Sequence, residues 1–312
     1  MLNREILIKR LALIKHLYKI GIEQSKQFET IASFSILSLH DSIEMFLKLL
    51  AEHKNIKSES FSFLDYWTNI PTLTLKESMR NLNARRVNIK HKGLLPSKAD
   101  IEISRVNTTD FFEQNTITQF GIEWNDISLL TLIQYDNVRQ HLEKAQQSLD
   151  ENKIEDCIEL SAIAFDELIY TYEDSKSSYF GNSPFYFGKN LSFLNSFFMG
   201  ISDDRKMSEF VDKVKDSLDG IQKAVKILSF GIDYKKFAKF KMLTPIVHRM
   251  VGGKHVAQIW GRKKWTKENC QYCIDFVLDS SLKLQEFDFD INELIENDRP
   301  TIIINDEKNA ST

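Results

Sequence analysis

The stretch KESMRNLNARRVNIKHKGLLPSK, residues 76–98, concentrates positive charge on a single predicted helix. It gathers six basic side chains into little more than three helical turns, and Glu77 is its only acid. These side chains are Arg80, Arg85, Arg86, Lys90, His91 and Lys92. Gly93 and Pro96 follow, and both are typical of a helix end. The stretch therefore predicts a helix with a strongly basic C-terminal half.

The composition around this stretch favours an all-α protein. Of 312 residues, 42% are hydrophobic, whereas only 11 are glycine and 5 are proline, which is sparse for a turn-rich β-protein. No apolar run approaches the length of a membrane span, so we expect no membrane association. Three cysteines, an odd and small number, are typical of a reducing compartment, and we expect a cytoplasmic protein.

Apolar residues at three- and four-residue steps predict a series of helices. The expected helices cover residues 3–20, 28–53, 73–91, 127–149, 153–173, 204–228 and 266–286. We divide the chain into a first helical domain, residues 1–125, a second helical domain, residues 126–295, and a polar, disordered tail, residues 296–312. Both domains run from long helices to a glycine-bearing basic turn, so the second half is a candidate degenerate copy of the first.

Arg86 and His91 frame the motif R-V-N-I-K-H and suit the chemistry of RNA cleavage without a metal. An imidazole can take the proton of a ribose 2′-hydroxyl, and a guanidinium can hold the phosphate that this hydroxyl attacks. Asn88 is a candidate to orient the imidazole or to donate to the phosphate, and Lys90 adds charge. We expect no metal and no other cofactor.

Helical geometry restricts how these two residues can act together. Five positions on an α-helix rotate by roughly 500°, which leaves Arg86 and His91 about 140° apart. They meet only if the helix loosens before Gly93, if Arg86 reaches around, or if a second chain supplies half of the site. The alternative is a solvated basic helix end, because cations stabilise the negative end of the helix dipole.

The stretch LNARRVNIKHKGLLPS, together with LHDSIEMFLKLLAEH at residues 39–53, resembles bacterial HEPN-domain proteins over about residues 1–120. The resemblance implies an α-helical bundle and, in active members, a metal-independent endoribonuclease whose two motifs meet at a homodimer interface. It also implies roles in toxin–antitoxin or phage-defence systems, with RNA and an antitoxin or effector protein as partners. Arg86 and His91 match the fixed positions of the motif, but Val87 stands where a polar residue often follows the arginine.

Two acids on the predicted helix at residues 28–53 match the acidic position that accompanies the motif. Asp41 or Glu44 would hold Arg86 or His91 by an ion pair across the bundle. The alternative is local pairing of Glu44 with Lys48, which lies one helical turn away.

A second basic surface is predicted between residues 234 and 267, which contain ten lysines or arginines and no acid. Aromatic residues lie between these cations and would stack on unpaired bases while the cations contact phosphates. The predicted nucleic-acid contacts are Arg85, Lys92, Lys235, Lys236, Lys239, Lys241, Arg262, Lys263 and Lys264. Alternatively the aromatics are core, and the cations are solvated or dock on the acid-rich residues 150–174. The rival to an endoribonuclease is thus a non-catalytic module that binds RNA or a partner protein.

Overall fold

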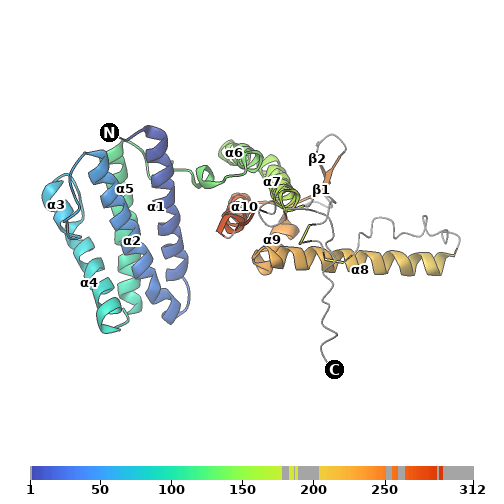
Figure 1. Ribbon diagram of the computed structural model, residues 1–312, viewed down its shortest axis with the longest axis horizontal. Helices are drawn as coiled ribbons and strands as arrows, with labels where there is room; N and C mark the ends of the chain where they lie inside the picture. Colours follow the sequence, from blue (N-terminus) through green and yellow to red (C-terminus); the bar gives the residue numbers. More distant parts are fainter. Residues whose placement is uncertain are drawn as a thin grey trace, which may run out of the picture. The chain divides into compact units, whose positions relative to one another are not determined.

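The computed structural model of the protein describes residues 2–177, 183–185, 187–188, 204–250, 255–258, 264–286 and 288–290. These residues form ten α-helices, one short 3-10 helix and one two-stranded sheet, so the chain is predominantly helical, as predicted (Figure 1). None of the described helices combines the length and the apolar character that crossing a membrane requires. The predicted tail, residues 296–312, lies outside the described residues.

The chain divides into two compact units, Met1–Leu132 and Ile133–Thr312. The elements of the first unit are α1 (Arg4–Ser25), α2 (Glu29–His53), α3 (Asp65–Asn69), α4 (Lys76–Lys92), α5 (Lys98–Phe120) and the 3-10 helix η1 (Leu129–Leu132). Helix α2 contacts α1, α4 and α5, which lie beside it in Figure 1. It occupies this central place because apolar residues cover much of its surface, and most of them are fully buried.

Aromatic side chains fill the core of the first unit. Phe46 from α2 meets Phe111 and Phe112 from α5 edge to face, with ring centroids 5.4 and 5.7 Å apart. Phe112 also stacks on Trp124, in the segment after α5, at 4.2 Å. This core holds α2 and α5 in fixed positions, and α4 packs against both of them.

The helix ends around the basic stretch follow from local sequence. Gly93 ends α4 with a φ of +64°, a conformation that costs glycine little because it has no Cβ. Ser97 then caps α5: its side chain accepts from the Asp100 N–H, and the Asp100 carboxylate accepts from the Ser97 N–H in return. The chain therefore turns sharply after the basic tip of α4 and returns as α5.

The predicted helix at residues 127–149 is wrong in its first part. Helix α6 begins only at Asp136, and η1 precedes it. Ile127 is instead buried in the core of the first unit, and its carbonyl accepts a 2.8 Å hydrogen bond from Lys15 Nζ. The same ammonium group also donates to the carbonyls of Trp124 and Asn125, so this segment belongs to the first unit.

The second unit starts with the predicted helical hairpin. Its elements are α6 (Asp136–Asp150), α7 (Ile154–Ser175), α8 (Arg205–Ser229), α9 (Tyr234–Leu243), β1 (Ile246–Arg249), β2 (His255–Gln258) and α10 (Lys267–Glu286). Helix α10 packs against α6, α7 and α9. Strands β1 and β2 form an antiparallel pair in which Val247 lies opposite Ala257, and this pair was not predicted.

The relation between the two halves stays a prediction. Gly231 follows α8 with a φ of +69°, much as Gly93 follows α4. The second unit nevertheless carries a strand pair before its last helix, and the described residues of the first unit contain no strand.

Candidate functional site

Helix α4 presents its two adjacent arginines to different neighbours. Arg85 turns toward α5, where its Nε donates to Asp100 at 3.0 Å and its Nη1 donates to Ser104 at 3.2 Å. Arg86, rotated by about 100° around the helix, turns toward α2. Arg85, predicted to contact nucleic acid, is therefore half-buried in contacts that join α4 to α5.

Arg86 lines a cavity of about 600 Å³ in the first unit. The other lining residues are His40, Glu44, Lys48, Ser58, Glu59, Phe61, Phe63, Tyr66, Asn83 and Val87. The Arg86 Nε is buried and has no hydrogen-bond partner, and the guanidinium makes no ion pair with any described residue. A buried donor without a partner is costly, so this guanidinium is prepared to receive an acceptor from a ligand.

His40 forms the back wall of this cavity, with only 2% of its surface exposed. Its Nε2 lies 3.1 Å from Asn83 Oδ1, its Nδ1 lies 3.4 Å from Asp41 Oδ1, and its ring stacks on Phe63 at 4.4 Å. Burial lowers the pKa of His40, while the hydrogen bond with Asp41 raises it and the positive charge of Arg86 lowers it further. A buried imidazole with a lowered pKa thus lines the same cavity as the guanidinium.

The two predicted acids behave differently. Glu44 pairs with Lys48 at 2.7 Å, and this contact lowers the pKa of the Glu44 carboxyl. Asp41 is half-exposed beside His40. Among the described residues, neither acid forms an ion pair with Arg86 or His91, although Glu44 lines the same cavity as Arg86. Glu44 therefore forms the local ion pair with Lys48 that was the alternative to an ion pair across the bundle.

The predicted base, His91, lies outside this cavity. Helix α4 continues without a break to Lys92, so it does not loosen between Arg86 and His91. His91 is exposed, as are Lys90 and Lys92. Within one chain, the structure does not bring the imidazole of His91 to the guanidinium of Arg86.

Asn88 lies one helical turn before the end of α4 and is half-buried. Its carbonyl accepts from the Leu94 N–H at 3.1 Å, which closes the end of the helix. Its side chain lies outside the residues that line the cavity.

His40, Asp41 and Glu44 form a cluster with the composition of a metal site. One ligand atom from each residue lies within 4.8 Å of the others. However, Lys48 already neutralises Glu44, and the charge of Arg86 acts on both His40 and Glu44. This positive charge opposes a further cation at the cluster. Glu59 also lines the cavity, so the charge that the cavity offers to an anionic ligand is that of the unpaired Arg86 guanidinium.

The second basic surface is only partly available to a ligand. Phe237 and Phe240 of α9 turn inward against Phe165 and Phe276, as the core alternative predicts. Lys236 approaches Asp279 at 3.8 Å, and Lys239 lies over the Tyr272 ring at 3.8 Å. Lys235, Lys241 and Lys264 are exposed, whereas Arg262 and Lys263 lie outside the described residues.

The acid-rich segment binds part of this positive charge inside the second unit. Glu167 of α7 accepts from Arg249 of β1 at 2.5 Å. Glu173 accepts from Lys226 of α8 at 2.8 Å, but Lys226 lies outside the second basic surface. The Arg249–Glu167 contact is therefore of the kind that internal docking on residues 150–174 predicts.

No protein-family model, curated protein or solved structure matches this chain. The site is consequently interpreted from its own geometry. Two cavity residues, His40 and Asn83, were missed as functional candidates. The available signal was the spacing of His40 and Glu44, one helical turn apart in a largely apolar helix.

The buried imidazole of His40 leads us to expect that the first unit becomes less stable as the pH falls. Its folded-state pKa is lowered, so the unfolded chain binds more protons as the pH falls from the ordinary value of 6.5 toward the folded-state value. The contribution of His40 to the unfolding free energy is therefore fully present above pH 6.5 and is lost as the pH falls below it. We expect the difference in urea-unfolding free energy between pH 7.5 and pH 5.5 to shrink in His40→Gln. An unchanged difference would contradict this account.

Proposed function

We propose that this protein is a metal-independent endoribonuclease of the HEPN type, in which Arg86 binds the scissile phosphate. One observation carries the proposal: the Arg86 guanidinium, which has no partner among the described residues, lines a 600 Å³ cavity beside the buried imidazole of His40. The planar fork of a guanidinium matches the oxygens of a phosphodiester, which can accept two parallel hydrogen bonds from it. The helical architecture of the first unit agrees with such a domain.

The reaction needs a base, a phosphate-binding cation and an acid. His91 takes the proton from the 2′-hydroxyl, whose oxygen forms a bond to phosphorus while the bond to the 5′-oxygen breaks. Arg86 stabilises the charge that gathers on the phosphorane, and the departing 5′-oxygen takes up a proton. The products are a 2′,3′-cyclic phosphate and a 5′-hydroxyl, and no metal takes part.

A homodimer reconciles this chemistry with the geometry. Arg86 and His91 face about 140° apart on one unbroken helix, so a single chain presents only one of them to a given phosphate. A second copy of the chain would supply the missing imidazole. Lys90 and Lys92 flank His91 on the exposed end of α4, where they would hold the RNA backbone.

A non-catalytic module that binds RNA or a partner protein is the second candidate. The position of His91 outside the cavity favours it, as does Val87, an apolar residue directly after Arg86. In this case the cavity would bind a phosphate group without cleaving its ester.

Cleavage of a labelled RNA in the presence of a chelator distinguishes the two candidates. We expect the wild type to cleave with or without the chelator and His91→Ala to lose about 100-fold or more, because general base catalysis contributes that much. His16→Ala, a change of a histidine on α1 outside the cavity, should cleave as the wild type does.

Two other outcomes would contradict the proposed endoribonuclease activity. Cleavage that the chelator abolishes would contradict the metal-independent mechanism. RNA binding without cleavage, equal in the wild type and in His91→Ala, would establish the binding module in its place.

A further inference from the structure

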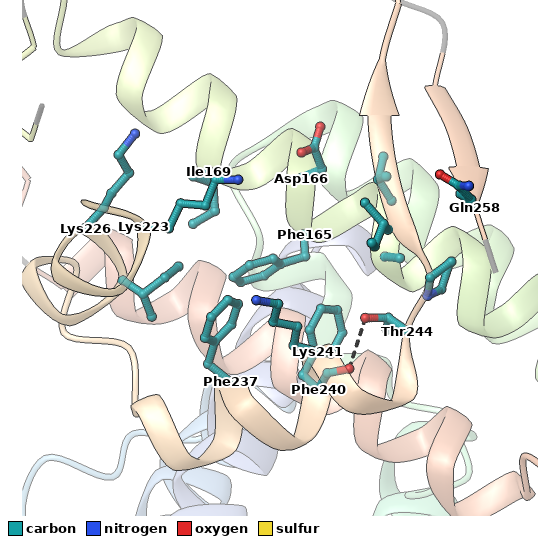
Figure 2. A pocket seen from close by; sticks show the side chains of 15 residues that line it. Phe165, Asp166, Ile169, Lys223, Lys226, Phe237, Phe240, Lys241, Thr244 and Gln258 are labelled. Carbon is teal, nitrogen blue, oxygen red and sulfur yellow. Dashed lines mark hydrogen bonds between the residues drawn. The ribbon is translucent and has the colours of Figure 1, made fainter. Parts of the chain in front are cut away.

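The second unit contains a separate cavity of about 580 Å³ between α7, α8, α9 and β1. Its walls are mostly apolar: Phe165 of α7 and Phe237 and Phe240 of α9 lie side by side in its lining (Figure 2). The other apolar lining residues are Ala162, Ile169, Ile227, Pro245, Ile246 and Val247. Cavities of this size with a few polar groups are typical sites for small ligands.

Two ammonium groups at this cavity have no partner in the described chain. Lys223 of α8 and Lys241 of α9 both line the cavity, and neither forms an ion pair or hydrogen bond with a described residue. Figure 2 shows both side chains directed toward the cavity, whereas Lys226 points away from it. Lys226 is bound to Glu173 through both carboxylate oxygens at 2.8 Å.

Few other polar groups are available to a ligand. The Thr244 hydroxyl already donates to the Phe240 carbonyl at 2.9 Å. Asp166 approaches Arg249 and His255 at 3.7 and 3.6 Å, and burial raises the pKa of its carboxyl. Gln258 also lines the cavity, but its Oε1 already lies 3.3 Å from His248 Nε2, within hydrogen-bond distance.

This distribution selects the class of ligand. A nucleobase would lose the hydrogen bonds of its edge in walls that offer so few donors and acceptors. A hydrocarbon chain has no hydrogen bonds to lose there, and its burial against three phenylalanine rings is favourable in free energy. Lys223 and Lys241, two exposed cations without a partner in the described chain, favour a negative charge at one end of the ligand.

We propose that this cavity binds an amphipathic anion, an apolar chain with one anionic head group. The chain lies among Phe165, Phe237 and Phe240, and the head group lies between the ammonium groups of Lys223 and Lys241. A free fatty acid and a monoalkyl phosphate share this chemistry. The proposal is independent of RNA cleavage, because every lining residue belongs to the second unit.

The test is displacement of a fluorescent fatty acid, cis-parinaric acid, from the full-length protein. We expect saturable binding of the probe and displacement by palmitate or hexadecyl phosphate, and the tighter of the two identifies the head group. Hexadecanol and hexadecylamine should compete at least about tenfold more weakly, since they lack the negative charge.

Charge reversal locates the site. Lys223→Glu and Lys241→Glu should each weaken palmitate binding about tenfold. Lys213→Glu on α8 and Lys235→Glu on α9 are the matched controls, because both lysines are exposed and lie outside the lining. Ala162→Phe, which fills the cavity from α7, should abolish binding.

Three results would overturn the proposal. The first is the absence of saturable probe binding to the folded wild type. The second is equal competition by hexadecylamine and palmitate, which would mean that the lysines do not read the head group. The third is equal weakening by the cavity lysines and by their controls. Circular dichroism of each variant confirms that a loss of binding is not a loss of fold.

Discussion

Arg86→Ala is expected to reduce RNA cleavage about 100- to 1,000-fold, the loss that follows removal of a donor to a transition-state oxyanion. The reason is the position of this side chain: it is the cation of α4 that lines the cavity beside His40. Because the guanidinium makes no hydrogen bond or ion pair with the described residues, its removal should leave the melting temperature nearly unchanged.

The matched control is Arg80→Ala on the same helix. Arg80 is exposed, and its one ion pair with a described residue is with Glu77 at 3.0 Å, a surface contact of small energetic value. It should therefore cleave RNA as the wild type does. Arg86→Lys should be intermediate, because lysine keeps the charge but cannot donate two parallel hydrogen bonds to a phosphate. Equal cleavage by Arg86→Ala and Arg80→Ala would remove Arg86 from the mechanism.

Mixing two inactive variants tests whether the site is shared between chains. In a dimer of Arg86→Ala with His91→Ala, one of the two composite sites keeps both residues. Random exchange makes half of the dimers mixed, so cleavage should return to about a quarter of the wild-type rate. A mixture that stays inactive would contradict the composite site.

Expression of the protein in cells tests the toxin or defence role that the resemblance implies. If the wild type is toxic, relief of this toxicity by Arg86→Ala would support that role.

The sequence predicts the position of the basic helix but not the direction of its side chains. Gly93 and the Ser97–Asp100 box are local signals, because each acts on the backbone within four residues: Gly93 ends α4, and the box begins α5. Arg85 and Arg86 are chemically identical and adjacent. Only the packing of α4 between α2 and α5 decides that Arg85 binds Asp100 and Arg86 faces the cavity.

Long-range contacts explain the remaining differences. Ile127 has the apolar character of a helix face, yet it is buried in the first unit, where Lys15, more than a hundred residues earlier, holds its carbonyl. The cavity beside Arg86 likewise depends on His40 and Asn83, whose 3.1 Å contact crosses from α2 to α4. Periodicity and spacing describe one element at a time, so neither contact could be predicted.

Phe112→Ala should have the largest effect on stability and lower the unfolding free energy by about 3–5 kcal/mol. Phe112 has no exposed surface and contacts four aromatic rings: Tyr18, Phe46, Phe111 and Trp124. Truncation removes these contacts and leaves a void that the surrounding helices cannot fill completely. Urea unfolding followed by far-ultraviolet circular dichroism measures the loss.

The matched control is Phe34→Ala on α2. This phenylalanine is 49% exposed, so the same truncation there should change the unfolding free energy by only about 0.5 kcal/mol. A loss below 1 kcal/mol for Phe112→Ala would mean that the core repacks around the void.

The location of the effect matters as much as its size. The two units have separate cores, so amides of α2 and α5 should exchange faster in Phe112→Ala while those of α7 and α10 keep their rates. Because Phe46 and Phe112 together hold α2 against α5, the α2 wall of the Arg86 cavity should loosen as well. RNA binding should then weaken in Phe112→Ala, while binding of palmitate by the second unit should persist.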